Sequence, residues 1–292
     1  MNPESYRMVD FLNQAVTRGT HVLHHTPEWL RLRPGLFHSV SFIFLSVLLT
    51  VSCDTQPTAS DQNGTGNGNG DDDPAYSHTR NPGMSAIDFL RNDDFTEVLV
   101  EIQYMPGYRP ADSGLDELQA FLQDHLDKAD VIIAEPEEVP SGGQEQYSAN
   151  DVRQLEEEHR RHFTEGSTLA SYNLFVDGSY TDGNVLGIAY YNTSNAYFGA
   201  TIHDISGSPP LNPSREKVEG TVLRHEYGHL LGLVDNGVEM QEHHQENGPH
   251  CTDEGCVMYH AVNTTDFFAN MFDDSISDLD EYCLQDIHAV QE

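Results

Sequence analysis

The chain has 292 residues, which is enough for one large domain or two small ones. It carries 48 Asp and Glu against 14 Lys and Arg, so its formal net charge is −34. This balance argues against nucleic-acid binding, because phosphate contacts need clustered basic side chains. Molar salt shortens the Debye length to roughly 3 Å and screens such a surface, so we expect adaptation to high salt. The alternative is an ordinary acidic secreted protein.

The only strongly apolar run covers residues 36–53, "LFHSVSFIFLSVLLTVSC". It is short for a membrane-spanning helix and follows two arginines, as the apolar region of a signal peptide does. Its end, "LTVSC", resembles a bacterial lipoprotein signal, in which Cys53 is lipidated and begins the mature chain. An ordinary signal peptide or an anchor helix is the alternative. We therefore expect an extracytoplasmic protein that is held on a membrane of the cell envelope, or is secreted. The long stretch before the run contains acidic residues, so we expect the true translation start to lie further downstream.

Residues 54–93 are rich in Gly, Asn and Asp and have too few apolar side chains to form a core. We predict a disordered tether over this range and one folded domain over 94–292.

The folded part alternates between strand and helix patterns. We predict strands at 95–105, 130–135, 169–178, 184–192 and 196–205, and helices at 113–129, 148–163, 214–231 and 279–290. Ser113 and Ser148 are predicted helix caps. This order predicts an α+β fold in which a twisted mixed sheet is backed by helices and followed by a loop-rich C-terminal part.

The helix predicted at 214–231 contains His225, Glu226 and His229. Histidines four residues apart lie on the same face of a helix, so both imidazoles can bind one zinc ion. Glu226 lies about 100° round the helix, where it can act as general base on a water that zinc has made more acidic. Two histidines on a solvated helix face are the alternative reading of this pattern.

Gly232 and Met258 extend this pattern beyond the helix. His225-Glu226-x-x-His229-x-x-Gly232 followed by Met258 resembles the metzincin zinc metallopeptidases. The stretch "HCTDEGCVM" is similar to the His-Cys-x4-Cys-x-Met segment of archaemetzincins. The resemblance implies a metzincin-like fold, a catalytic zinc, and Met258 as an apolar floor beneath the histidines. It also implies that the strand near residues 197–202 binds extended substrate by edge pairing.

The third zinc ligand is open at this stage. Asp235 occupies the position of the third metzincin histidine, and a carboxylate can bind zinc. In archaemetzincins that histidine directly precedes the cysteine, which corresponds to His250 here and is the ligand that we favour. If His250 binds the metal, Asp235 is a turn residue, because Asp-Asn-Gly is a strong turn signal. His243 and His244 are further candidates.

Cys251, Cys256 and Cys283 follow the histidine motif. Archaemetzincins hold a structural zinc with four cysteines, and here Asp286 stands where a fourth cysteine would be expected after Cys283. Outside the cytoplasm, a disulfide between Cys251 and either Cys256 or Cys283 is the simpler expectation. A second zinc with Cys and Asp or His ligands is the alternative.

Tyr259 and two charged runs are the remaining features of note in the sequence. Tyr259 follows the methionine directly, an offset that does not match the tyrosines that steady an oxyanion in some metzincins. The acidic run at 273–281 and the charged run at 156–163 are predicted to be solvated faces, since the first lacks the glycine and spacing of an EF-hand loop.

These features predict a monomeric zinc endopeptidase that hydrolyses proteins or peptides outside the cytoplasm. A zinc-containing surface lipoprotein without catalytic activity, acting as a binding or structural module, is the alternative. An aminopeptidase would need an anion to bind the free amine of its substrate, and the sequence identifies none.

Overall fold

Strand β1 (Glu97–Tyr104) lies within a six-stranded sheet. The computed structural model describes residues 75–207, 212–268 and 276–292. The other strands are β2 (Asp130–Ile133), β3 (Glu137–Glu138), β4 (Gln146–Tyr147), β5 (Thr168–Val176), β6 (Ser179–Tyr180), β7 (Gly187–Tyr191) and β8 (Ser194–Phe198). The helices are α1 (Ala86–Leu90), α2 (Asp112–His125), α3 (Ala149–His159), α4 (Gly199–Ile205), α5 (Arg215–Leu230), α6 (Thr265–Phe268) and α7 (Glu281–Gln291).

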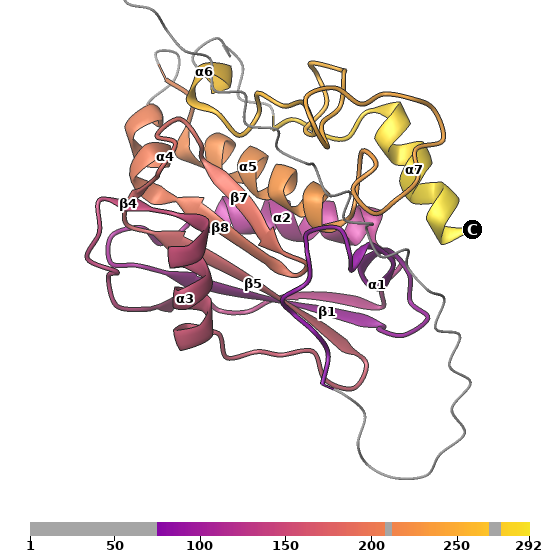
Figure 1. Cartoon of the computed structure of the whole chain (residues 1–292), viewed down its shortest axis with the longest axis horizontal. Coiled ribbons are helices and arrows are strands. Elements are labelled where there is room, and N and C mark those ends of the chain that lie inside the picture. Colours follow the sequence, from indigo (N-terminus) through magenta and orange to yellow (C-terminus); the bar gives the residue numbers. More distant parts are fainter. Residues whose placement is uncertain (1–74, 208–211, 269–275) are drawn as a thin grey trace, which may run out of the picture. The chain divides into compact units, whose positions relative to one another are not determined.

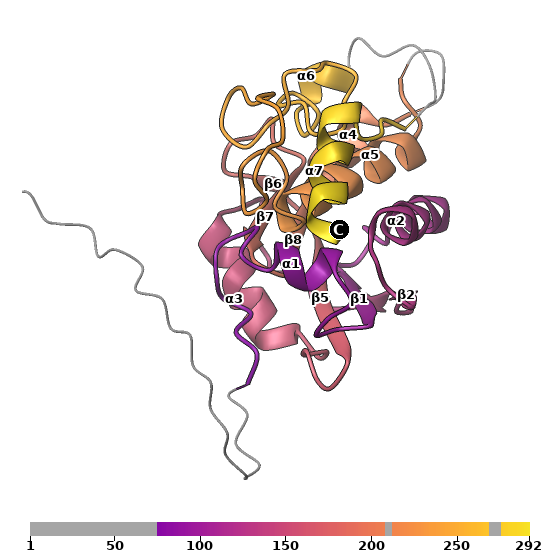
Figure 2. The same ribbon diagram turned by 90° about the vertical axis from the view of Figure 1, so that its right-hand side faces the viewer.

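The main sheet has the order β2-β1-β5-β8-β7, and β3 also pairs with β1. Its pairings are parallel except the last, because β7 runs antiparallel to β8. Helices α2 and α5 cover one face of the sheet, and α3 covers the other (Figures 1 and 2). β5 is buried along almost its whole length, as expected for a strand with helices on both faces. The predicted α+β class with a mixed sheet is therefore confirmed.

Side-chain caps mark the starts of the long helices. Ser148 and Asp151 form a capping box at the start of α3, and Ser214 accepts from the backbone N–H of Lys217 at the start of α5. The prediction for α2 is wrong in detail: Ser113 lies inside the helix, and Ala111 is its N-cap residue. The N–H of Ala111 instead donates to the buried carboxylate of Glu219 on α5 at 2.7 Å.

Only the first residues of the strand predicted at 196–205 form a strand, and the rest form a helix. β8 ends at Phe198 and α4 begins at Gly199, whose backbone lies so close to Tyr108 that an added Cβ would approach its ring to 2.3 Å. The segment was expected to bind substrate along an open edge. β8 instead pairs on both sides, with β5 and with β7, so the edge of the sheet beside α5 belongs to β7.

The folded structure begins before residue 94. Helix α1 lies within the range predicted as tether, and its Phe89 and Leu90 side chains are fully buried in the main core. Composition gave no sign of this because short apolar stretches become core only when other elements cover them. The predicted signal region with Cys53, and residues 54–74, lie outside the described residues. Within the described residues, no helix combines the length and apolarity needed to cross a membrane.

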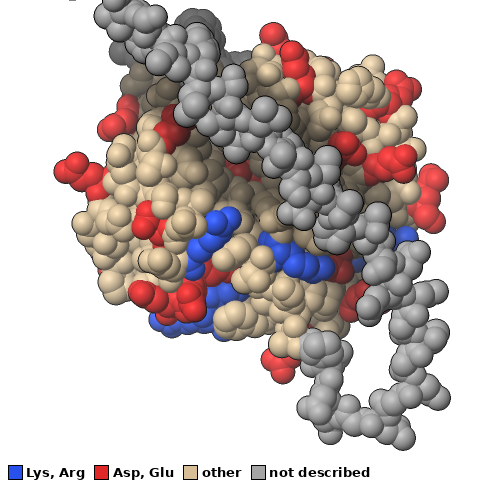
Figure 3. All heavy atoms as spheres, in the orientation of Figure 1, with Lys and Arg blue, Asp and Glu red and all other residues tan. Residues whose placement is uncertain are grey.

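The charged run at 156–163 is not a uniformly solvated face. Glu156 and Arg160 are both buried and form an ion pair at 2.6 Å, which Ser194 extends by donating to the same carboxylate. Arg160 also donates to the carbonyl of Ala170, which ties α3 to β5. Breaking a buried pair of this kind costs about 3–5 kcal/mol, so the pair matters for the α3 face of the sheet. Most other acidic side chains of the described residues lie on the protein surface, and they are spread over the face drawn in Figure 3.

Candidate metal centre

Three histidines converge at the end of α5, two from the helix itself and one from the loop that follows it. One ring nitrogen from each of His225, His229 and His250 lies within 4.8 Å of the others, so the three could hold a metal ion. The Nε2 atoms of His225 and His229 are 3.2 Å apart, one helical turn from each other on α5. His250 comes from the loop after the helix, and its ring stacks on His225 with centroids 5.3 Å apart.

Hydrogen bonds orient two of these rings. The Nδ1 atom of His225 lies 2.7 Å from the carbonyl oxygen of Val257, and that of His250 lies 2.8 Å from the carbonyl oxygen of Asn247. If each Nδ1 carries the proton and donates, the Nε2 lone pairs are left for a metal. The Nε2 atom of His250 is in fact buried without a hydrogen-bond partner.

Burial also keeps the histidines neutral. It lowers the pKa of His225 to about 3 and the pKa of His229 well below its ordinary value, and it lowers the pKa of His250 too. Because a neutral imidazole is the form that binds metal, the site is ready for a cation at neutral pH.

Met258 lies directly beneath the helix. An added Cβ at Gly228 would lie 2.1 Å from the Met258 sulfur, so a glycine is needed for this close approach. Met258 is fully buried in the main core, in the place expected for an apolar floor beneath the histidines. Gly232, with φ of +72°, ends the helix in the left-handed conformation that glycine adopts readily.

Glu226 faces a cavity of about 290 Å³ beside β7. Burial raises the pKa of its carboxyl to about 8, against the opposing effect of hydrogen bonds from Asn263 and from the backbone of Ala189. Gly187 lies so close that an added Cβ would be 2.9 Å from the Glu226 carboxylate. The cavity is lined by Asn81, Pro82, Gly187, Ile188, Ala189, Glu226, His229, Asn236, Pro249, His250 and Asn263.

The other candidates for the third ligand lie elsewhere. Asp235 is exposed and has φ of +57°, which makes it a turn residue, as expected if His250 is the ligand. His243 is exposed. His244 is buried against Tyr282 and lies 3.6 Å from Asp286. Tyr259 packs against His260 and is not among the residues that line the cavity.

The three described cysteines form a second cluster instead of a disulfide. Cys251, Cys256 and Cys283 are free, and their sulfurs and an Asp280 oxygen lie within 4.8 Å of one another, so this group could also hold a metal ion. The Cys256 and Cys283 sulfurs are 3.7 Å apart, far beyond a bonded distance of about 2.05 Å.

The fourth member of this cluster is Asp280 and not Asp286, the residue singled out in the sequence. Asp286 accepts from the backbone N–H of Gln241 at 2.7 Å and lies beside His244. Asp280 also caps α7, so part of the acidic run 273–281 faces inward rather than solvent. Hydrogen bonds from the neighbouring thiols hold the pKa of Cys251 well below its usual range.

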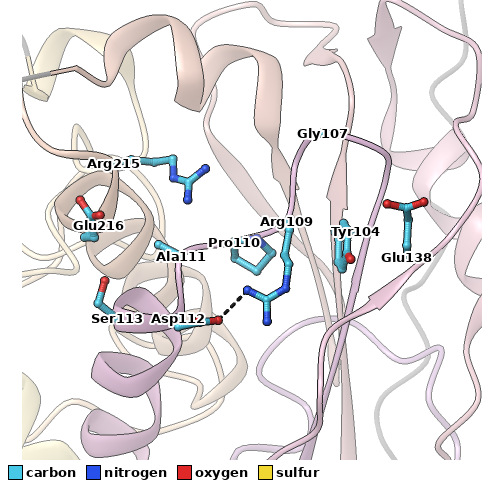
Figure 4. Close-up of a pocket in the computed structure, with 10 residues that line it drawn as sticks. All are labelled: Tyr104, Gly107, Arg109, Pro110, Ala111, Asp112, Ser113, Glu138, Arg215 and Glu216. Carbon is cyan, nitrogen blue, oxygen red and sulfur yellow. Dashed lines mark hydrogen bonds and ion pairs between the residues drawn. The ribbon is translucent and has the colours of Figure 1, made fainter.

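A larger cavity, of about 630 Å³, lies away from the histidines near the starts of α2 and α5 (Figure 4). Its cationic groups already have acidic partners: Arg109 donates to Asp112 at 2.6 Å, and Arg215 lies 3.5 Å from Glu219. Neither metal-ligating cluster of the described residues contributes to its lining.

No protein-family model matches the chain, and no curated protein matches its sequence. Among solved structures, the chain is similar to archaemetzincin from Methanopyrus kandleri, with 15% identity and a TM-score of 0.45 over 68% of this chain and 96% of that one. It is also similar to metalloproteinase-II from Bacteroides fragilis, with 14% identity and a TM-score of 0.37 over 71% and 60%.

Sequence reasoning missed three residues of the site. Asn263 and Asn236 line the cavity, and Val257 supplies the carbonyl that orients His225. Isolated asparagines in loops carry no spacing signal, and a backbone carbonyl acts through its position alone. The nearness of Val257 to Met258 was the only hint available.

Replacing His250 and Asp235 separately tests which residue is the third ligand. His250→Ala should weaken zinc binding by more than about 100-fold, beyond the 10–100-fold typical of residues outside the ligand shell. Asp235→Asn should leave it unchanged, because asparagine tolerates the left-handed backbone. Competition with a chromogenic chelator measures both affinities. Equal losses in the two variants would contradict the assignment.

Proposed function

We propose that this chain is a zinc-dependent peptidase in which His225, His229 and His250 bind the metal and Glu226 is the general base. The observation that carries the proposal is the buried carboxylate of Glu226 beside three neutral histidines, in a cavity that opens along the edge of β7.

The histidine nitrogens suit zinc in number and spacing. Nitrogen ligands at 2.0–2.1 Å in tetrahedral geometry lie roughly 3.3 Å apart, close to the 3.2 Å between the Nε2 atoms of His225 and His229. The Nε2 atom of His250 is buried without a hydrogen-bond partner, and a bound metal ion would supply the partner that a buried polar atom needs. Three ligands leave one tetrahedral position open, which is the mark of a catalytic site.

The metal and Glu226 would have different roles in the reaction. When bound, zinc polarises a carbonyl group and lowers the pKa of a water towards roughly 7. Glu226 accepts a proton from the attacking water and delivers it to the departing amine, so that a C–O bond forms as the peptide C–N bond breaks. A positive charge at the histidines favours the ionised carboxylate and opposes the effect of burial on its pKa. Asn263 and the Ala189 backbone hold that carboxylate in place.

A second candidate function is a binding or structural module that keeps the metal without catalysis. Such a site would be closed by four protein ligands, whereas three histidine nitrogens converge within the described part of the chain. It would also have no use for a carboxylate that is buried next to the ligands at a cost in solvation.

Glu226→Gln should lower kcat for a peptide substrate by about 10²–10⁴-fold, the usual contribution of a general base, while zinc content stays the same. Glu219→Gln is the matched control, since Glu219 is buried on the same helix but faces Ala111. A quenched peptide library in molar salt provides the assay. Wild-type rates in Glu226→Gln would exclude Glu226 as the general base and overturn the proposal, whereas absence of cleavage by the wild-type protein would favour the binding module.

We further propose that Cys251, Cys256, Cys283 and Asp280 bind a second, structural zinc. Three thiols and a carboxylate form a closed set of four ligands within a buried cluster, as a structural site requires. His250 directly precedes Cys251, so this metal would fix the loop that carries the third histidine.

Zinc analysis of the purified protein should then give two equivalents per chain. Asp280→Asn should release one of them, although asparagine can still cap α7. Asp286→Asn should keep both, and serves as the control on the same helix. Two equivalents retained in Asp280→Asn would exclude this carboxylate as a ligand.

For location, we propose an extracytoplasmic, salt-adapted lipoprotein anchored at Cys53, with proteins or peptides as substrates. The apolar run before Cys53 and the acidic composition support this proposal. Mass spectrometry of the mature N-terminus tests it: an unmodified chain that begins elsewhere would contradict it.

A further inference from the structure

The exposed edge of β7 is short and is blocked by backbone at both ends. Gly187, Ile188 and Ala189 of this strand line the cavity next to Glu226. Beyond each end of β7, another segment of the chain already pairs with the neighbouring backbone. The length of edge left for a ligand is therefore limited by two segments of the chain, residues 263–265 and residues 77–82, which we call the first wall and the second wall.

The first wall comes from the loop after Met258. The N–H of Leu186 donates to the carbonyl of Asn263 at 2.9 Å, and the N–H of Thr265 donates to the carbonyl of Asn184 at 3.1 Å. Val185 and Thr264 form an antiparallel bridge between these two bonds. The edge just before β7 is thus occupied, and Asn263 stands at the border of the cavity.

The second wall comes from the N-terminal segment. The N–H of Asn192 donates to the carbonyl of Arg80 at 2.9 Å, and the N–H of Arg80 donates to the Asn192 side chain at 3.0 Å. The next two residues, Asn81 and Pro82, line the cavity. The edge just after β7 is therefore occupied as well.

Asn192 holds this second wall rigidly. It is fully buried, and its side-chain amide also donates to the Ser77 carbonyl at 3.0 Å and to the Ser85 hydroxyl at 2.8 Å. His78 adds a further anchor, with Nδ1 3.1 Å from the Thr193 hydroxyl. The segment is thus held to the end of β7 by four hydrogen bonds of Asn192 and one contact of His78.

We propose that these walls make the enzyme an oligopeptidase, which cleaves short extended peptides and discriminates against long chains. This inference rests on the proposed peptidase function. An extended peptide advances about 3.4 Å per residue, so the five residues of β7 set an upper limit of about five paired residues of substrate. Within β7, the backbone of Ala189 already bonds Glu226, and the carbonyl of Tyr190 accepts from Arg153 at 3.2 Å, which shortens the free edge further.

A cavity of about 290 Å³ lies at the lower end of the range for ligand pockets, which agrees with a short ligand. A longer chain must bend away from β7 at Asn263 or at Arg80, and it loses the pairing beyond.

A ladder of internally quenched peptides tests this, with one central cleavable bond, lengths from four to sixteen residues, and acetyl and amide ends. We expect kcat/KM to peak near about six residues and to fall at least about tenfold by sixteen, because a longer chain meets the backbone at Asn263 or at Arg80 and must bend away from β7. A tenfold fall corresponds to a cost of about 1.4 kcal/mol for this bend. Casein should be a poor substrate. Equal or rising kcat/KM up to sixteen residues would overturn the oligopeptidase assignment but keep the peptidase. Failure to cleave any peptide in a Glu226-dependent way would overturn both.

Asn192→Ala tests the second wall as a positioning element. Freeing the segment should raise kcat/KM for the sixteen-residue peptide relative to the six-residue one by about fivefold to tenfold, a ratio that general destabilisation does not change. Asn150→Ala, at an exposed asparagine on α3, is the matched control and should leave the ratio unchanged.

A second variant covers the case in which Asn192→Ala does not fold. The double variant Asn81→Gly/Pro82→Gly loosens the second wall at two residues that are not buried, since Asn81 is exposed and Pro82 is half-buried. It should raise kcat/KM for the sixteen-residue peptide relative to the six-residue one, as Asn192→Ala does. An unchanged ratio in the variants that fold would show that the N-terminal segment does not limit substrate length.

Discussion

The contact between Gly228 and Met258 is the constraint on which the metal centre depends. It brings the loop at 250–258 against the C-terminal end of α5, with the methionine sulfur where any residue larger than glycine would place a side chain. One residue before Met258, the carbonyl of Val257 meets Nδ1 of His225. The same contact thus fixes the depth of the loop beneath the helix and the orientation of one histidine.

The cysteine cluster completes this arrangement at the other end of the loop. Cys251 follows His250, Cys256 precedes Val257, and Cys283 with Asp280 brings the start of α7 to the same point. Backbone bonds reinforce the loop, since the N–H of Cys251 donates to the carbonyl of Met258 at 2.8 Å. The two clusters therefore belong to one structural unit, in which the second holds the third histidine of the first in place.

The surroundings of Glu226 set it apart from the other carboxylates of this strongly acidic chain. The general excess of carboxylates lies mostly on the surface, whereas Glu226 is buried with hydrogen bonds from Asn263 and Ala189. The strand that supplies Ala189 is limited at one end by the loop that carries Asn263, and at the other by the N-terminal segment. The position of Glu226 and the length of the free β7 edge are thus set by the same few backbone contacts.

Features that rest on local periodicity could be predicted from the sequence. The helix with His225 and His229 and its end at Gly232 follow from patterns within a few residues. The order of strand and helix patterns predicted the mixed sheet. Tertiary structure decided which distant segments meet. It brings His250 and not Asp235 beside His225 and His229, and Asp280 and not Asp286 beside the cysteines. It also makes β7 and not β8 the edge of the sheet and packs α1 into the core. Such choices depend on loop paths and on which strand lies outermost, and no local spacing encodes them. The sequence therefore specified the helical half of the metal site, and long-range packing completed it.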